Sequence, residues 1–518
     1  MKTPLHGHSP SRDIEDIILL RDESVAIHTW LKSQSISHLK DFAKFMQMTL
    51  NSMLHVELDH NARFKLLELF HPAVEYICLT LGNHYLDPNT PPAEKNVQVI
   101  NLAQQLEMTI VSQYLAVIKS LVRVKYGKEI EDLMGASIYH GMIHLAGILI
   151  RSYEFYAPTY PQAWYCLHQL YQYAEIYKLT NYVPEMEETN VRKINNIRQI
   201  YLETLLLGTS TPYELQHHDL HLIISMLPQW SGYVTLSGLN QGVGDFVVHI
   251  DKDIPPFRHE FIRVSETGDR YRLLDIKSLE QHLHSLLLQS RQATSATTSE
   301  TDTLPAYILE QLIQAWSKAT PRRYPRVMMG GKLHVVAGLT KLHHHVNLQS
   351  SSVNTASTNT KKINQQFSTW QIVDTSPNGY CLKMPYTAHI RLHAGELVGL
   401  QEENEISLSR WGIGMIRWVK HSVDDTYNIG VQLIAPTGTP ISFYIQNVID
   451  QPAESLPGFL LPGLTRLQQE KTLLLPVLPV HEGAILNIQA EDSNYTVQLS
   501  KLTHRTSSFM QYEFIEPG

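Results

Sequence analysis

The sequence predicts a multidomain α+β protein with an all-helical N-terminal region, a small α+β middle unit and a C-terminal region rich in short strands. Three observations predict this class. The 518 residues are enough for three or four domains of roughly 100–200 residues. The composition, 43% hydrophobic and 18% charged, supports packed globular cores. The period of the apolar residues also changes after Trp230, from helical spacing to the spacing of strands.

Residues 12 to about 230 predict one helix after another, and we expect a helical domain over residues 1–230. Pro72 predicts a kink or a break in the helix expected at 63–81. The stretch 133–150 contains no Asp, Glu, Lys or Arg, but it is at the short limit for a membrane span and carries two histidines, so we expect a buried core helix. The predicted helices are 63–81, 97–124, 130–156, 163–177, 194–207 and 211–226.

A small α+β unit is expected over residues 231–290, because four short strand patterns precede one amphipathic helix at 276–288. The predicted strands are 233–236, 245–250, 259–264 and 271–274. The polar, Ser/Thr-rich stretch that follows predicts a linker over 291–305, and a short helix is expected at 306–317.

Short strands with glycine turns dominate from Leu333 onward and indicate a barrel or a sandwich. Residues 350–360, which are rich in Ser, Thr and Asn, predict a flexible inserted loop. The predicted strands are 333–338, 369–374, 379–384, 397–402, 407–419, 429–435, 441–449, 472–478, 484–488 and 495–502.

The net charge and the number of cysteines indicate which partners and which cellular compartment the protein has. The formal net charge of −8 argues against a general nucleic-acid binder. Three scattered cysteines are too few for a disulfide framework, which fits a reducing cytosol. The first residues lack the apolar core of a secretory signal. We therefore expect a cytoplasmic protein without a membrane span or a nucleic-acid partner.

The usual enzyme motifs are missing from the sequence. Residues 330–332 (Gly-Gly-Lys) lack the upstream glycine and the following Ser or Thr of a phosphate-binding loop, and there is no nucleophile elbow and no GxGxxG motif. We therefore predict neither an enzyme nor a cofactor. An enzyme within the helical region stays an alternative, since it would need perturbed carboxylates or histidines that only a structure can reveal.

Three groups of histidines are candidate metal ligands, but none predicts a metal site. In the first group, glycine stands where a zinc-protease motif has glutamate. In the second, no cysteine or further carboxylate is obviously paired with the histidines. In the third, neighbouring histidines on an expected strand would point to opposite faces. The groups are His140 with His144, His217 with His218 and His221, and His343 with His344 and His345.

Positive charge is concentrated in one segment of this acidic chain. No acidic residue occurs between Glu310 and Asp374, and the densest basic part is 321–326, PRRYPR. The planar guanidinium of arginine makes paired hydrogen bonds to phosphate and to the O6/N7 edge of guanine. A solvated basic face is the simpler interpretation of such a cluster. The other basic residues of the gap are Lys318, Lys332, Lys341, Lys361 and Lys362.

Two motifs in this region resemble those of a known family. The pattern Arg322-x-x-x-Arg326, a following strand and then Asp374-x-Ser376-x-x-Gly379 looks like the RxxxR and DxSxxG pair of PilZ domains. That family consists of bacterial receptors for cyclic di-GMP built on a six-stranded β-barrel. Strands at 414–418 and 429–433 are similar to its later strands, so the resemblance spans about residues 321–447.

The resemblance implies a PilZ-like six-stranded barrel within a domain at 306–450, followed by a C-terminal β-rich extension at 451–518. It also implies roles for six residues. The loop arginines hold the phosphates and guanines of cyclic di-GMP, while the second motif binds guanine and shapes the pocket wall. By resemblance these residues are Arg322 and Arg326, with Arg323 as a helper, and Asp374, Ser376 and Gly379.

We therefore expect a cytosolic effector that binds cyclic di-GMP and relays its level to a protein partner through interdomain rearrangement. The family implies outputs such as motility, type IV pili or biofilm matrix, and a partner from pilus, flagellar or biofilm machinery. The alternative is a PilZ-like scaffold or protein-interaction module that has lost the ligand. The lengthened spacing between the two motifs favours this alternative, whereas the intact Arg322, Arg326, Asp374 and Ser376 disfavour it.

Overall fold

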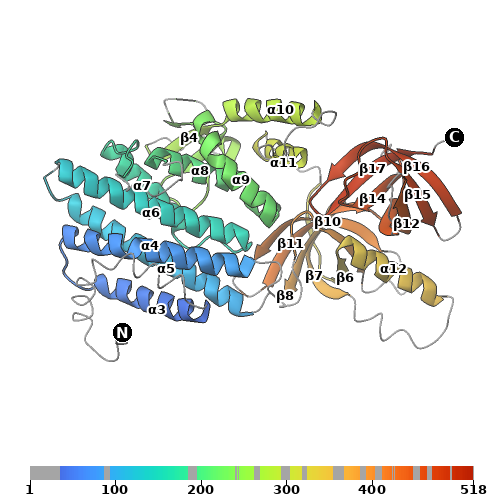
Figure 1. Cartoon of the computed structure of the whole chain (residues 1–518), viewed down its shortest axis with the longest axis horizontal. Coiled ribbons are helices and arrows are strands. Elements are labelled where there is room, and N and C mark those ends of the chain that lie inside the picture. The colour runs from blue at the N-terminus through green and yellow to red at the C-terminus, as the bar shows by residue number, and fades with distance from the viewer. Residues whose placement is uncertain are drawn as a thin grey trace.

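The structure, a computed structural model, places a helical domain at one end of the molecule and two β-barrels at the other (Figure 1). This mixed architecture confirms the predicted fold class. The structure describes residues 36–86, 94–125, 127–184, 195–239, 242, 244–261, 269–292, 304–317, 324–353, 367–385, 392–402, 411–422, 424, 426–446, 455–463, 470–490 and 493–516.

The helical domain is a bundle whose helices bury their apolar faces in one continuous core. α4 continues through Pro72, so the predicted break is absent. Buried Leu67, Val74 and Ile77 on both sides of the proline hold the helix in place by packing. The helices are α3 (Ile36–Met53), α4 (His60–Leu86), α5 (Glu94–Leu121), α6 (Lys128–Glu154), α7 (Ala163–Ile176), α8 (Ile197–Thr209) and α9 (His217–Trp230), with a 3₁₀ turn, η2, at Pro212–Glu214.

The apolar helix α6 lies inside this bundle. Its length and composition would allow a membrane span, but 61% of its most apolar 18-residue window is buried in the protein. This agrees with the expected core helix. Near its end, Arg151 forms a buried ion pair with Glu107 of α5, and the two side chains are only 8% and 6% exposed. The central helices are therefore joined by charge as well as by apolar packing.

The middle unit is a four-stranded antiparallel sheet in the order β1-β4-β2-β3. A strand was expected at 259–264, but the structure has only a short strand before it and a 3₁₀ turn at His259–Phe261; residues 262–268 lie outside the described ranges. The elements are β1 (Thr235–Gly238), β2 (Phe246–His249), β3 (Phe257–Arg258), β4 (Tyr271–Asp275), α10 (Lys277–Gln292) and α11 (Ala306–Trp316).

Helix α11 belongs to the helical core, although the boundary expected at residue 306 groups it with the barrel. Ile308, Leu312 and Trp316 are buried there, and the Trp316 indole donates a hydrogen bond to Thr209 of α8 at 3.1 Å. Apolar residues at i, i+4 and i+8 produce this face. The helical domain therefore extends to the residues just before the arginine motif.

The first barrel has six strands in the order β7-β6-β9-β10-β11-β8, and pairing of β7 with β8 closes it. This confirms the predicted six-stranded barrel. Trp370, Leu382 and Ile416 are fully buried in its core. The strands are β6 (Lys332–Ala337), β7 (Ser368–Ser376), β8 (Gly379–Pro385), β9 (Leu397–Glu402), β10 (Gly412–His421) and β11 (Thr426–Ala435), and a short β5 (Val327–Met328) pairs with β7.

A second closed barrel stands where the sequence predicted only a β-rich extension from residue 451. Its strand order is β12-β13-β14-β17-β16-β15. Its first strand starts at Thr439. The range 306–450 expected for the first barrel therefore includes a strand that belongs to the second barrel. The strands are β12 (Thr439–Ile445), β13 (Leu456–Leu461), β14 (Thr472–Pro476), β15 (Ile485–Ala490), β16 (Ser493–Arg505) and β17 (Phe509–Ile515). The sequence did not predict β13 or β17.

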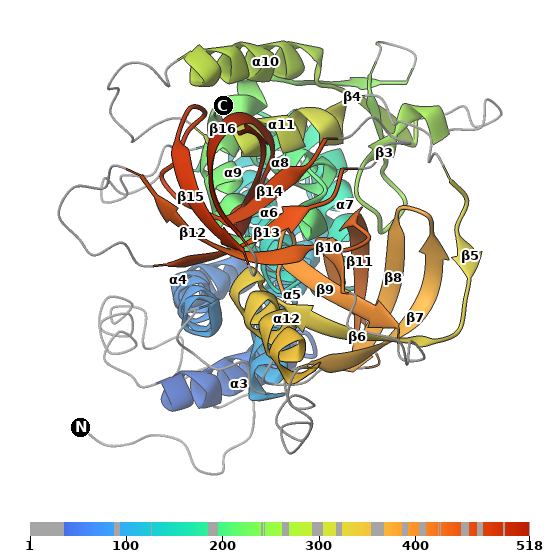
Figure 2. The same ribbon diagram turned by 90° about the vertical axis from the view of Figure 1, so that its right-hand side faces the viewer.

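A helix, α12 (Leu339–Val353), lies between the two barrels (Figure 2). Leu339, Leu342 and Val346 share one face of α12 and pack in a core with strands of both barrels. The expectation of a flexible loop at 350–360 is thus wrong for residues 350–353, while the remainder lies outside the described ranges. The histidines at 343–345 also lie on this helix rather than on a strand.

Tyr156, just after α6, joins the helical domain to the first barrel. Its ring is buried in the core of that barrel. Its hydroxyl donates to the carbonyl oxygen of Leu215 at 2.8 Å and accepts from the Ala394 amide at 3.2 Å. The His421 amide donates to its carbonyl oxygen at 2.7 Å. Its φ of +52° is uncommon outside glycine, so the surrounding contacts must stabilise this turn.

Candidate ligand-binding site

The first barrel brings parts of the two sequence motifs into direct contact. Arg326 directly precedes β5, which is antiparallel to β7 with Met328 opposite Asp374. The Arg326 Nη1 lies 3.1 Å from Asp374 Oδ1 and donates a hydrogen bond to Oδ2 at 3.3 Å. The Arg326 side chain is 33% exposed, so the guanidinium remains accessible from solvent. β5 therefore places a cation at the edge of the β7–β8 hairpin.

The second motif forms the turn of this hairpin. Ser376 pairs with Gly379 across a two-residue connection, and the Ser376 hydroxyl donates to the Gly379 carbonyl oxygen at 3.4 Å. A Cβ atom at Gly379 would overlap the carbonyl oxygen of Val431 on the neighbouring β11. The hairpin can therefore lie against β11 only because residue 379 is glycine.

Asp374 has hydrogen-bonding capacity that Arg326 does not use. Its Oδ1 is buried and, among the residues that the structure describes, accepts no well-directed hydrogen bond despite the nearby guanidinium. Cys381 of β8 lies opposite Asp374 in the strand register. Burial raises the pKa of Cys381, the Asp374 carboxylate raises it further, and Arg326 opposes both. The site thus pairs a buried acceptor with a partly exposed donor.

Apolar side chains lie exposed beside Arg326. Val327, Met328 and Met329 follow it directly, and Met328 is 78% exposed. In the sequence, these residues are marked only as three apolar residues in a row next to a basic cluster, and they were not among the predicted site residues. Together with Arg326 they form a surface that carries a positive charge next to exposed apolar side chains.

Four of the six predicted site residues are brought together here, namely Arg326, Asp374, Ser376 and Gly379. Arg322 and Arg323 lie outside the described residues. The structure describes the chain again from residue 324, and residues 324–326 lead directly into β5 beside Asp374.

The first predicted histidine group forms a buried cluster in the helical domain. His71 Nδ1 and His144 Nε2 are 2.9 Å apart, and His140 Nε2 is 3.5 Å from Glu68 Oε2. Burial lowers the pKa of His71 to about 3, with His140 adding to the effect and Glu68 opposing it. Burial likewise keeps the pKa of His144 well below its usual value. The rings of His71 and His144 therefore pack as neutral core residues.

Comparison with known proteins places every domain in one family. Family models match residues 25–241 (cyclic-di-GMP receptor FimW, N-terminal domain), residues 245–365 and 347–440 (its middle PilZ domain) and residues 444–516 (FimW C-terminal beta-barrel domain). The cyclic-di-GMP receptor FimW of Pseudomonas aeruginosa is 24% identical over 549 aligned residues, which cover 94% of this chain and 90% of that protein. The chain therefore belongs to the FimW family of cyclic-di-GMP receptors, with a middle PilZ domain and a C-terminal β-barrel.

Proposed function

We propose that this chain binds cyclic di-GMP between the 322–326 segment and the β7–β8 hairpin of the PilZ barrel. The observation that carries the proposal is the Arg326–Asp374 contact, which joins the two motifs in space. In this proposal Arg322 and Arg326, helped by Arg323, bind phosphates and guanines. Asp374, Ser376 and Gly379 form the wall that receives guanine.

The charges and contacts of the site suit this ligand. Its phosphates are anions that compete with Asp374 for the Arg326 guanidinium through charge-assisted hydrogen bonds. Guanine carries an N2 amino donor, and the buried Oδ1 of Asp374 is an acceptor with unused capacity. The exposed side chains at 327–329 offer apolar surface for a base to cover. Binding thus replaces one ion pair with a larger set of contacts.

Changing Arg326 or Arg322 to alanine is expected to weaken cyclic di-GMP binding by roughly ten- to a hundred-fold in calorimetric titration. Each change removes charge-assisted hydrogen bonds worth about 1.5–3 kcal/mol. Arg326→Lys should also lose affinity, because a lysine ammonium cannot make the paired bonds of the guanidinium fork.

The matched control is Arg270→Ala, which removes an exposed arginine of the middle unit that pairs with Asp251. This variant should bind like the wild type. Unchanged affinity in both Arg322→Ala and Arg326→Ala would remove the site assignment. A wild-type chain that releases no binding heat and shows no saturation by a second method would favour the ligand-free scaffold instead.

We further propose that binding reorients the helical domain relative to the barrels and so signals to a protein partner, from pilus, flagellar or biofilm machinery. The proposed ligand contacts the short connection between α11, which is fixed in the helical core, and β5. The joint also contains partly exposed contacts, including Arg417 of β10 with Glu214 of η2 at 3.1 Å. A cleft of about 160 Å³ lies beside this pair. A ligand that prefers one arrangement of this joint shifts the population toward it.

Cyclic di-GMP is therefore expected to change hydrogen exchange at 213–216 and 415–417 as well as at the hairpin. A coupling of about 1–3 kcal/mol between ligand and domain arrangement would alter local protection roughly 5- to 150-fold. Small-angle scattering with and without ligand gives an independent measure of the domain arrangement. Tight binding with protection changes confined to the ligand site would refute the relay and leave a passive binder.

A further inference from the structure

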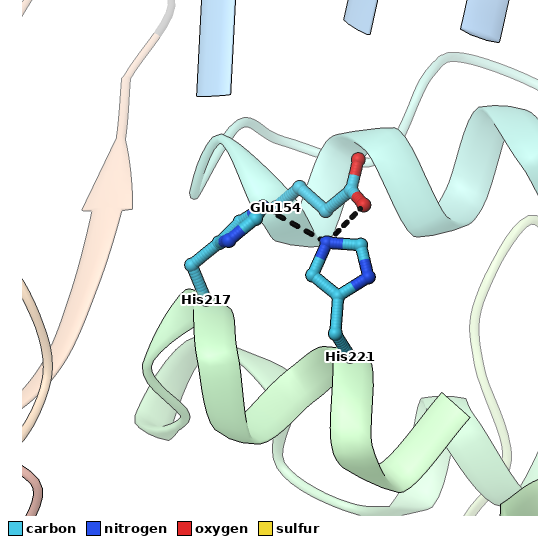
Figure 3. A group of neighbouring side chains, drawn as sticks. All are labelled: Glu154, His217 and His221. Atoms are coloured by element: carbon cyan, nitrogen blue, oxygen red, sulfur yellow. Dashed lines mark hydrogen bonds and ion pairs between the residues drawn. The ribbon is translucent and has the colours of Figure 1, made fainter. Parts of the chain in front are cut away.

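A second group of polar side chains lies at the joint between the helical domain and the barrels. His217 and His221, one turn apart at the start of α9, point toward Glu154 at the end of α6 (Figure 3). The two Nε2 atoms are 3.0 Å apart, and His221 Nε2 is 3.1 Å from Glu154 Oε1. Histidines at i and i+4 share one face of a helix, so α9 aims both rings at one point.

We propose that Glu154, His217 and His221 bind a zinc ion that links α6 to α9 at this joint. Two imidazoles and one carboxylate are a set of ligands that zinc accepts, with water in the fourth position. The sequence predicted no metal site because, beyond the neighbouring Asp219, no cysteine or further carboxylate was obviously paired with these histidines. The fold supplies the carboxylate from another helix.

The distances suit a small tetrahedral ion. Zinc lies about 2.0–2.2 Å from nitrogen and oxygen ligands, so two ligand atoms around one ion are roughly 3.3–3.5 Å apart. The ligand atoms of the three residues all lie within 4.8 Å of one another. The two close pairs, at 3.0 and 3.1 Å, lie within a few tenths of an ångström of this spacing, and the third pair has to close from at most 4.8 Å.

The arrangement of donors and acceptors also favours a cation. His221 Nε2 lies 3.0 Å from His217 Nε2 and 3.1 Å from Glu154 Oε1, so the three atoms face one another. The His221 Nε2 carries at most one proton but faces both the His217 nitrogen and the carboxylate. A divalent ion would take a lone pair from each of the three ligand atoms, and its binding would displace any proton from His221 Nε2.

The surroundings give the ion a structural role. Glu154 is two residues before Tyr156, which is anchored in the barrel core, and its side chain is only 10% exposed. His217 directly follows Gln216. The side-chain amide of Gln216 donates a hydrogen bond to the Ser508 hydroxyl of the second barrel at 2.9 Å. A zinc ion here would stabilise the meeting point of all three domains.

The test is zinc titration of the whole chain after chelator treatment and dialysis, with a chromophoric zinc indicator as competitor. We expect the wild type to bind one Zn²⁺ with a Kd below about 1 µM. Changing His217 or His221 to alanine, or Glu154 to glutamine, should weaken this site by about 100-fold or more. His218→Ala is the matched control, because this exposed neighbour lies outside the cluster, and it should keep the site within about threefold.

Cobalt gives a second readout, since the visible spectrum of bound Co²⁺ reports tetrahedral coordination, and circular dichroism checks that each variant is folded. Zinc should also raise the melting temperature of the wild type and of His218→Ala, but not of His217→Ala. The proposal is overturned if the wild type has no site tighter than about 10 µM. It is equally overturned if folded His217→Ala and His221→Ala bind zinc like the wild type.

Discussion

Arg151→Met is expected to destabilise the helical domain by about 3–5 kcal/mol, because it leaves the Glu107 carboxylate buried without its partner. Arg151 donates hydrogen bonds to both carboxylate oxygens of Glu107. Burial alone would lower the pKa of Arg151, but Glu107 outweighs it, so the guanidinium stays charged in the core. Urea unfolding followed by circular dichroism measures the loss.

Two comparisons separate pairing from packing. Replacing both partners, in Arg151→Met with Glu107→Leu, should recover much of the lost stability, since an apolar pair of similar size is often neutral or better. The same Arg→Met change at Arg270, whose surface pair with Asp251 is largely exposed, should alter stability by about 0.5 kcal/mol or less. Equal losses at positions 151 and 270 would contradict the role given to the buried pair.

Leu342→Ala is expected to cost about 2–5 kcal/mol, because it removes a fully buried side chain from the core between the barrels. Its methyl groups lie against Gly399 of β9, where an added Cβ would overlap them. The surrounding strands belong to closed barrels and cannot easily collapse into the space. Urea unfolding followed by tryptophan fluorescence reports the change, since Trp411 lies in the same core.

His344→Ala is the matched control on α12, because this side chain is exposed. It should change stability by about 0.5 kcal/mol or less. If Leu342→Ala unfolds like the wild type, the packing of α12 between the barrels does not stabilise the protein as we infer.

The elements with strong local signals were predictable. Strands such as Gly379–Pro385 are short, mostly buried apolar runs that begin at a turn residue, and long helices such as α5 carry a repeated apolar face. The motif at 374–379 predicted its hairpin because Pro, Asn and Gly are turn residues. Local chemistry decided each of these elements.

Other features depend on contacts that no local pattern records. The apolar face of α12 ends in serines at 350–352, which alone favour a loop, and packing between two barrels stabilises the helix. The strand β5 has only two residues and both are exposed, so neither length nor burial marks it in the sequence. Closure of the second barrel depends on β12 pairing with β15 across intervening strands.

The same limit applied to the sites. The family resemblance named Asp374 and Arg326, but their direct contact follows from the β5–β7 register. Glu154 could not be assigned to His217 and His221, because they lie on separate helices whose approach is fixed by the bundle. Distances between side chains far apart in the sequence are a product of the whole fold.

The burial of Tyr156 means that the core of the PilZ barrel includes a side chain supplied by the helical domain. One of its interior side chains belongs to the turn after α6, far ahead of the barrel strands in the sequence, and the hydroxyl of that side chain is held by Leu215 and Ala394 from opposite sides of the joint. A fragment starting at residue 306 would lack this plug and would also expose the apolar face of α11. The barrel core is therefore complete only when the helical domain is present, and we expect a fragment without that domain to be less stable than the barrel in the whole chain.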